Sequence, residues 1–168
     1  MRILLLRLIW VLLGSAVAIT LALFATQVSS PLILASLGGT TLFLFGLTTA
    51  PAAQPRAVFG GHIISSVIGV IAYHSLGDAP WVMALAVVLT IAALLLTRTV
   101  HPPAGANAII MVQAHASFMQ IGLTVLVGIT VISSVAWIWS RLGFGIKKYP
   151  ISWSQPSPPS FDWSIWGE

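Results

Sequence analysis

Long apolar runs with very few charged side chains constrain this chain more than any other feature. The stretch from Ile3 to Ala25 is long enough, at about 1.5 Å per residue, to cross about 30 Å of bilayer hydrocarbon as a helix. Three further runs have similar length and character: Ala57 to Leu76, Ala79 to Leu96, and Phe118 to Ser140. Because 58% of the 168 residues are hydrophobic and only 6% are charged, the composition indicates an integral membrane protein.

The first 25 residues also match a secretory signal peptide, since basic residues accompany an apolar core and small residues follow it. The apolar run is longer than the core of a signal peptide needs to be. Its length therefore favours a retained first helix.

Two more apolar segments, Pro31 to Ala50 and Thr99 to Ala114, do not have the pattern of plain helices. Each carries proline near its start and small residues in its middle. Proline lacks a backbone N–H and biases the preceding residue toward an extended conformation, so His101 should be extended. We expect an extended stretch and then a short helix in each segment, with helix starts near Gly38 and Ala104.

Positively charged residues favour the cytoplasmic side of a membrane, and here they favour six crossings. With the N-terminus inside, six crossings place every Lys and Arg on the cytoplasmic side: Arg2, Arg7, Arg56, Arg98, Arg141, Lys147 and Lys148. Four crossings, with the two interrupted segments dipping in and returning, would leave Arg56 and Arg98 outside. We therefore expect six crossings of a bacterial inner membrane, with both termini cytoplasmic.

The chain also resembles itself. The matching pairs are Trp10 to Ala25 with Trp81 to Leu96, Ser36 to Phe45 with Pro103 to Val112, Gly61 with Gly128, and Ser66 with Ser133. An odd number of crossings per repeat makes the two halves antiparallel, as in several transporter folds. We predict an all-α membrane protein of two inverted repeats, residues 3–76 and 79–140, each with two full transmembrane helices and one broken segment.

The composition changes after residue 142, where we place the end of the transmembrane domain. Residues 143–168 are rich in Pro, Ser and Trp. Proline opposes helix, and tryptophan suits the headgroup zone of a membrane. We expect a cytoplasmic tail that lies on the membrane face or on a neighbouring subunit, with a disordered end as the alternative.

In this arrangement the two short helices would begin near the midplane and face each other. A helix N-terminus carries unpaired N–H donors and about half a positive charge, and neither segment holds a carboxylate. Two facing N-termini would bind a small anion. The substrate-binding candidates are Gly38, Gly39, Thr40, Thr41, Gly105, Ala106 and Asn107, and the pore or entrance candidates are His62, Ser66, Arg98, His101, Pro102 and Pro103.

These residues also have purely structural explanations. Glycines serve close helix packing, and the spacing of Gly61, Ser65 and Gly69 predicts a packing stripe inside the bundle or between subunits. His62 alone would equally suit a hydrogen bond between helices. Arg98 would equally anchor a helix end among lipid headgroups.

The sequence gives little support to catalysis or to a bound cofactor. The three acids, Asp78, Asp162 and Glu168, lie in a loop and in the tail, so no catalytic residue is predicted. The chain has no cysteine, and its histidines are spread over separate segments, which disfavours a metal site. We also expect no cofactor and no nucleic-acid partner, because no ATP-binding motif and no basic run is present.

Three motifs together resemble the HPP family of membrane proteins: "SLGGTTLFLF" from Ser36, "AQPRAVFGGHIISSVIG" from Ala53, and "RTVHPPAGANAII" from Arg98. The resemblance covers about Ser36 to Ser140. The residues at its motif positions are Gln54, Pro55, Gly60, Gly61, His62, His101, Pro102, Pro103 and Gly105, while Asn107 stands where relatives often carry Thr. The resemblance implies four membrane helices, as the family is usually described, and an association with nitrite transport in cyanobacteria and chloroplasts.

The resulting hypothesis is a membrane channel or facilitator for a small monovalent anion, and nitrite as that anion follows from the resemblance. One alternative is a proton-coupled anion transporter that uses His62 or His101. Another is a non-transporting membrane subunit that assembles partners through its Gly and Ser faces. Since a chain of this length encloses little space by itself, we also expect a homo-oligomer in the lipid bilayer.

Overall fold

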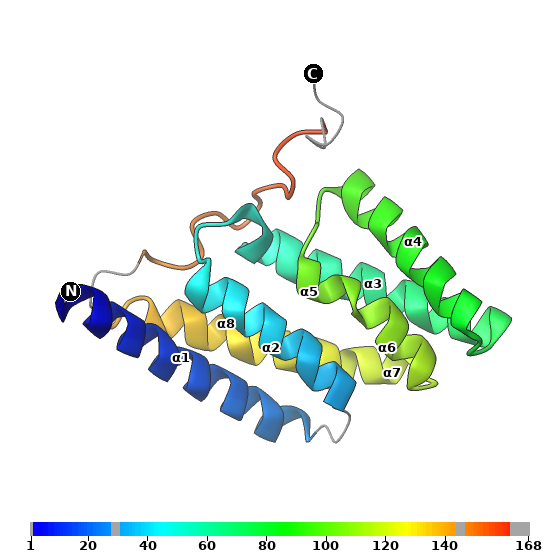
Figure 1. The fold of residues 1–168 in the computed structure, drawn as a ribbon, viewed down its shortest axis with the longest axis horizontal. Helices are drawn as coiled ribbons and strands as arrows, with labels where there is room; N and C mark the ends of the chain where they lie inside the picture. Colours follow the sequence, from blue (N-terminus) through cyan, green and yellow to red (C-terminus); the bar gives the residue numbers. More distant parts are fainter. Residues whose placement is uncertain (1, 28–30, 144–146, 162–168) are drawn as a thin grey trace.

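The structure is a computed structural model that describes residues 2–27, 31–143 and 147–161. The described residues form helices and no strand (Figure 1). In chain order the helices are α1 (Arg2–Thr26), α2 (Pro31–Gly46), α3 (Pro55–Leu76), α4 (Pro80–Thr97), α5 (Pro102–Gly105), α6 (Asn107–Gln113), α7 (Phe118–Gln120) and α8 (Val127–Trp139). A 3-10 turn, Pro51–Ala53, precedes α3, and a π-helical stretch, Ile121–Leu126, joins α7 to α8 in one continuous rod.

Proline begins α2, α3, α4, α5 and the 3-10 turn, because its missing N–H and fixed φ angle suit the first helical position. This corrects one prediction. The helix α2 begins at Pro31 and continues through Gly38 and Gly39, so the extended stretch expected before Gly38 is wrong. In the second interrupted segment His101 is extended, with φ −128° and ψ 103°. The helix there begins at Pro102 instead of near Ala104.

Four of these elements are long and apolar enough to cross a membrane: α1, α3, α4 and the rod Phe118–Trp139. The outward faces of α1 and α4 are strongly apolar, with Leu4 72% exposed, Phe24 77% and Leu96 67%. Large apolar side chains in such numbers on the outside are typical of a surface covered by lipid.

The two remaining passes, α2 and α5–α6, run between the same two ends of the bundle as the long helices (Figure 1). At one end His115, after α6, bonds Asp78, between α3 and α4, at 2.8 Å. Four crossings with two dips would put these two turns on opposite sides of the membrane. At the other end Arg56 donates a hydrogen bond to the carbonyl of Thr97 at 2.9 Å. The described chain therefore passes six times between two common ends.

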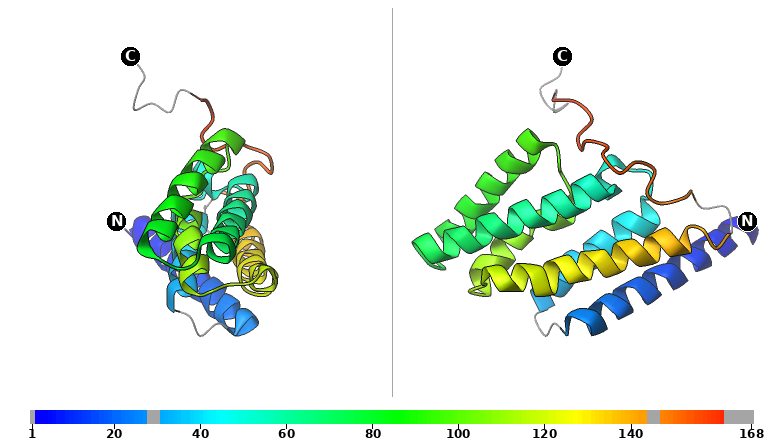
Figure 2. Two further views of the ribbon diagram at one scale, coloured as in Figure 1. Left: turned by 90° about the vertical axis from the view of Figure 1, so that its right-hand side faces the viewer. Right: turned by 180° about the vertical axis from the view of Figure 1, so that it is seen from behind.

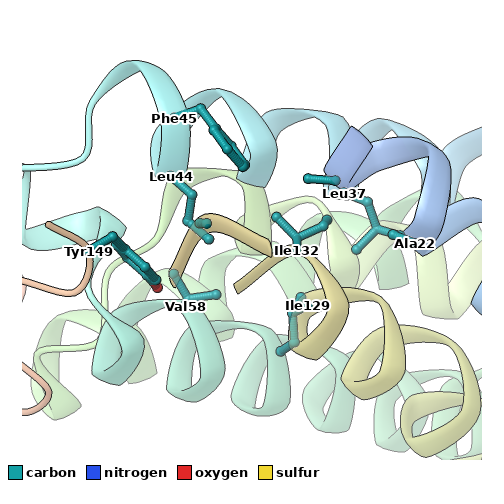
Figure 3. Close-up of a cluster of buried hydrophobic side chains, with 10 residues drawn as sticks. Ala22, Leu37, Leu44, Phe45, Val58, Ile129, Ile132 and Tyr149 are labelled. Atoms are coloured by element: carbon teal, nitrogen blue, oxygen red, sulfur yellow. The ribbon is translucent and has the colours of Figure 1, made fainter. Parts of the chain in front are cut away.

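The helices α2, α3 and α5–α6 lie at the centre, with α1 against α2 and α8 on one side and α4 against α3 and α6 on the other (Figure 2). A core of α2, α3 and α8 side chains includes Leu37, Leu44, Val58, Ile129 and Ile132 (Figure 3). Burying such side chains fixes how α2 and α3 lie against α8, and so how they lie against each other.

Residues 147–161 of the tail pack across the end of the bundle that carries Arg56 and Arg98. Ser157 pairs with the segment after α4 through backbone bonds, from Val100 N to Ser157 O at 2.7 Å and from Ser157 N to Arg98 O at 2.9 Å. This part of the tail is ordered against the bundle. Trp163 and Trp166, expected in the headgroup zone, lie outside the described residues.

Candidate functional site

Five polar side chains meet at the centre of the bundle, where α2, α3 and α5–α6 pack together. We call them the histidine cluster: Thr40 from α2, His62 and Ser66 from α3, His101 just before α5, and Asn107 at the start of α6. All five are buried, and both histidines have no exposed surface. Buried polar groups in a membrane bundle are expensive unless they bond one another, which these do.

The hydrogen bonds of the cluster form one line. Asn107 Nδ2 lies 2.9 Å from His62 Nδ1, and His62 Nε2 lies 2.9 Å from Thr40 Oγ1. The same Thr40 oxygen lies 3.0 Å from His101 Nε2, and His101 Nδ1 lies 2.6 Å from the carbonyl oxygen of Ala52. Ser66 accepts a second hydrogen bond from Asn107 at 3.0 Å. Every ring nitrogen of the two histidines therefore has a partner.

Small residues on α3 allow the second interrupted segment, Thr99 to Ala114, to come close enough to make these bonds. A Cβ on Gly61 would lie 2.9 Å from the Thr99 carbonyl oxygen and 3.2 Å from His101 Cβ. A Cβ on Gly69 would lie 2.6 Å from the Ala108 carbonyl oxygen. The predicted stripe of Gly61, Ser65 and Gly69 thus packs inside the bundle, where the Ser65 hydroxyl also donates to the carbonyl of Ala104.

Charged side chains near the cluster point away from it. Arg98 donates to the carbonyl of Pro158 at 3.1 Å and lies over the ring of Phe161. Asp78, the carboxylate among the described residues, bonds His115 at the far end of the bundle. The cluster thus holds several hydrogen-bond donors and no Lys, Arg or carboxylate side chain. No three His, Cys, Asp or Glu side chains within the described ranges lie close enough together to hold a metal ion.

The structure brings only part of the predicted site residues together. Thr40, His62, Ser66, His101 and Asn107 meet in the cluster, and Pro103 and Gly39 pack beside it, where the Ser36 hydroxyl donates to the Pro103 carbonyl at 3.0 Å. The others do not face it. Gly38, Pro102 and Ala106 are exposed, and Gly105 has nothing within 4 Å of its Cβ position. Thr41 donates to the Leu37 carbonyl of its own helix, and Arg98 donates to the tail.

The expected pair of facing helix N-termini is wrong. The helix α5 begins at Pro102, beside Ser36 and Thr40 in the middle of α2. The N-terminus of α2 is at Pro31, about three turns before Thr40. The reason is the proline at each start, since Pro31 begins a continuous helix instead of holding an extended stretch. The cluster is joined by side chains, and helix dipoles do not converge there.

One residue that spacing did not assign to the site is Gln54, which is fully buried. Its Nε2 donates to the carbonyls of Thr48 and Ala50, at 2.9 and 3.1 Å, and its Oε1 accepts from the backbone N–H groups of Ile151 and Ser152. Gln54 therefore ties the turn that carries Ala52 to the tail. Its place in a family motif was the signal available in the sequence.

A cavity of about 560 Å³ lies away from the cluster, between α3, α8 and the tail. Its lining includes Phe59, Ser133, Trp137, Tyr149 and Trp153. None of the predicted site residues lines it. Burial raises the pKa of the Tyr149 phenol beside it to about 12, so this group stays neutral.

Most of the chain matches a known family of membrane proteins. The sequence model of the family described as the HPP transmembrane region matches residues 1–150. The chain belongs to the HPP family. This match contains α1 to α8 and every residue of the histidine cluster, so the cluster is part of the HPP transmembrane region.

Two transmembrane proteins of Dictyostelium discoideum are similar to this HPP chain. One is 33% identical over 129 residues, which are 72% of this chain and 41% of the relative. The other is 30% identical over 138 residues, 77% of this chain and 48% of the relative. The chain therefore spans less than half the length of these relatives. No solved structure matches the chain.

Proposed function

We propose that this HPP protein carries a small monovalent anion, with nitrite as the first candidate, across the membrane through the histidine cluster. The observation that carries the proposal is the line of buried hydrogen bonds from Asn107 through His62 and Thr40 to His101. Polar groups at this depth are costly and mark substrate or ion pathways in membrane proteins. The choice of nitrite rests on the family resemblance.

The chemistry of the cluster suits an anion better than a cation. The Asn107 amide, the Thr40 hydroxyl and the ring N–H groups of the two histidines can donate hydrogen bonds. No carboxylate faces them within the described residues. In the present arrangement these donors bond one another and the carbonyls of Ser36 and Ala52, so an entering anion would replace some of these bonds. The exchange is possible because each bond lost is compensated by one to the anion.

We further propose that the two halves are inverted repeats. Two equivalent packing contacts support this: Gly61 of α3 lies against Ala104, and Gly128 of α8 lies against Leu37. The Ser36 to Pro103 match pairs these same residues, because it places Leu37 on Ala104 and Gly61 on Gly128. It also places Thr40 on Asn107, and these two residues bond opposite nitrogens of one ring, that of His62.

The outer helices fit the same proposal in a slightly different register. The buried residues of α1 are Gly14, Ala18 and Ala22, and those of α4 are Val82, Ala86, Thr90 and Leu94. A shift of one residue from the match between Trp10 and Trp81 places Gly14, Ala18 and Ala22 on the buried Ala86, Thr90 and Leu94. In this interpretation α2 and α5–α6 are the paired inner passes, and all six passes cross the bilayer.

Nitrite uptake into liposomes that contain the purified full chain tests the function. We expect uptake well above that of empty vesicles, and no uptake of a large anion such as gluconate. A non-transporting assembly subunit would give nitrite uptake equal to that of empty vesicles, which would overturn the proposal. Cross-linking in the same membranes tests the homo-oligomer that we propose for a chain of 17.8 kDa.

A further inference from the structure

We infer that His62, Thr40 and His101 form a proton relay, so that a proton moves through the bundle together with the anion. The relay deepens the proposed function, and only its coupling to the anion rests on that function. Its basis is geometric: one hydroxyl oxygen lies within hydrogen-bonding distance of a ring nitrogen from each of two buried histidines. Chains of this kind carry protons in pumps and transporters.

The direction of the hydrogen bonds follows from the two ends of the line. The Ala52 carbonyl can only accept, so His101 Nδ1 carries a proton and donates to it. In a neutral ring His101 Nε2 is then an acceptor, and the Thr40 hydroxyl can donate to it. The Ser36 carbonyl, 3.0 Å from the same hydroxyl oxygen, is a second acceptor for that single proton. At the other end the Asn107 amide donates to His62 Nδ1, so His62 Nε2 carries a proton and donates to Thr40. When the Thr40 hydroxyl turns from the Ser36 carbonyl to His101, all four bonds point from Asn107 toward Ala52.

Such a line transfers one proton with a complete balance. A proton that arrives at His62 Nδ1 makes this ring cationic. The His62 Nε2–H bond breaks as its proton passes to Thr40 Oγ1, and the Thr40 O–H bond breaks as its proton passes to His101 Nε2. His62 is neutral again, and His101 is now the cation. Loss of the proton on His101 Nδ1 to a water molecule that replaces the Ala52 contact completes the transfer. One proton is taken up from water that displaces the Asn107 amide at His62 Nδ1, and one is released to water at His101.

The end groups allow the line to reverse and then to reset. After transfer His62 Nδ1 carries the proton, and an Asn107 side chain turned by half a rotation would accept it through its carbonyl oxygen. At the other end the bare His101 Nδ1 would face the Ala52 oxygen, and two acceptors at that distance repel. The relay resets when both rings turn over, so that the proton of His101 again lies toward Ala52 and the proton of His62 again lies toward Thr40. The contact with Ala52 favours this original direction.

Few other groups face the two rings. From α2 these are Thr40 and Phe43, whose ring lies edge-on to His101 at 5.3 Å. From α3 and α6 they are Ser66 and Asn107. Arg56 and Arg98 bond the backbone of Thr97 and Pro158 at the bundle end. No carboxylate among the described residues faces either ring, so a proton on this line stays on the histidines.

Thr40 offers a clean test, because Thr40→Val removes the hydroxyl at nearly constant volume and Thr40→Ser restores it. The full chain would be reconstituted in liposomes that hold a pH-sensitive dye, with nitrite and internal pH followed together. Proton flux would also be driven without nitrite, by a potassium diffusion potential. We expect Thr40→Val to slow proton movement on the order of a hundredfold, and Thr40→Ser to retain most of it.

The results separate the relay from the anion pathway. One result would overturn the relay and leave the proposed function standing: Thr40→Val and Thr40→Ser take up nitrite at equal rates, and no proton moves with the anion. If nitrite uptake is absent, the proposed function fails, and the potential-driven flux alone decides the relay. Proton flux in the unmodified protein and in Thr40→Ser, but not in Thr40→Val, supports the relay. Equal flux in all three would overturn it, and a structural role alone would leave flux unchanged once each variant elutes as a folded species.

Discussion

The ring centroids of His62 and His101 lie 5.3 Å apart, and neither ring has exposed surface. One histidine comes from the middle of α3 and the other from the extended residue before α5. Asp78, the acid among the described residues, pairs with His115 and not with either ring. Two buried histidines that share one hydroxyl, without a carboxylate, are the feature on which the proposed transport and proton transfer depend.

Close packing at Gly61 should be essential to this arrangement. Gly61→Ala would place a methyl group 2.9 Å from the Thr99 carbonyl oxygen, which belongs to the segment that carries His101. Backbone cannot move aside as a flexible side chain can, so we expect a loss of about 1–3 kcal/mol in stability and a displaced His101. The measurement is the apparent melting temperature in detergent, followed by tryptophan fluorescence.

Gly105→Ala is the matched control, because Gly105 has nothing within 4 Å of its Cβ position and is helical. We expect it to melt at or slightly above the temperature of the unmodified protein. Equal melting temperatures for the two variants would contradict the packing that we describe around Gly61.

Gln54 should stabilise the turn before α3 and the tail together. Gln54→Leu leaves two carbonyls and two N–H groups without their partner. We expect a loss on the order of 3 kcal/mol and an apparent melting temperature lower by roughly 5–10 °C. Gln113→Leu, at an exposed position near the far end, should change the melting temperature little.

The six passes predict which loops share a side of the membrane. The chain has no cysteine, so single cysteines can be labelled from outside with an impermeant maleimide. Ser75→Cys and Gln113→Cys should both react in intact cells, and Lys147→Cys should react only after the membrane is opened. Labelling of Gln113→Cys without Ser75→Cys would support two dips instead of two crossings.

Apolar runs and the positions of Lys and Arg were enough to predict a helical membrane protein. The conformation of the two interrupted segments was harder to predict, because proline has two roles. It keeps the preceding residue extended, as at His101, and it also begins a helix, as at Pro31 and Pro102. A single sequence does not say which role prevails, and the prediction for α2 was wrong for this reason.

The members of the histidine cluster were among the predicted site residues, but their contacts were not predicted. His62 and His101 were both predicted to lie at a pore or its entrance, and nothing in helical spacing indicates that they share Thr40. The internal match held a signal, since it pairs Thr40 with Asn107, and both bond His62. Side chains that meet through tertiary packing leave no local pattern in the sequence.

Nitrite uptake by liposomes that contain Asn107→Asp tests the central claim most directly. The new carboxylate would lie beside His62 and repel an anion, so we predict that uptake falls to the level of empty vesicles. Gln113→Glu adds the same charge to the same helix away from the cluster, and it should retain the uptake of the unmodified protein. Nitrite uptake by folded Asn107→Asp at the unmodified rate would contradict passage of the anion through the histidine cluster.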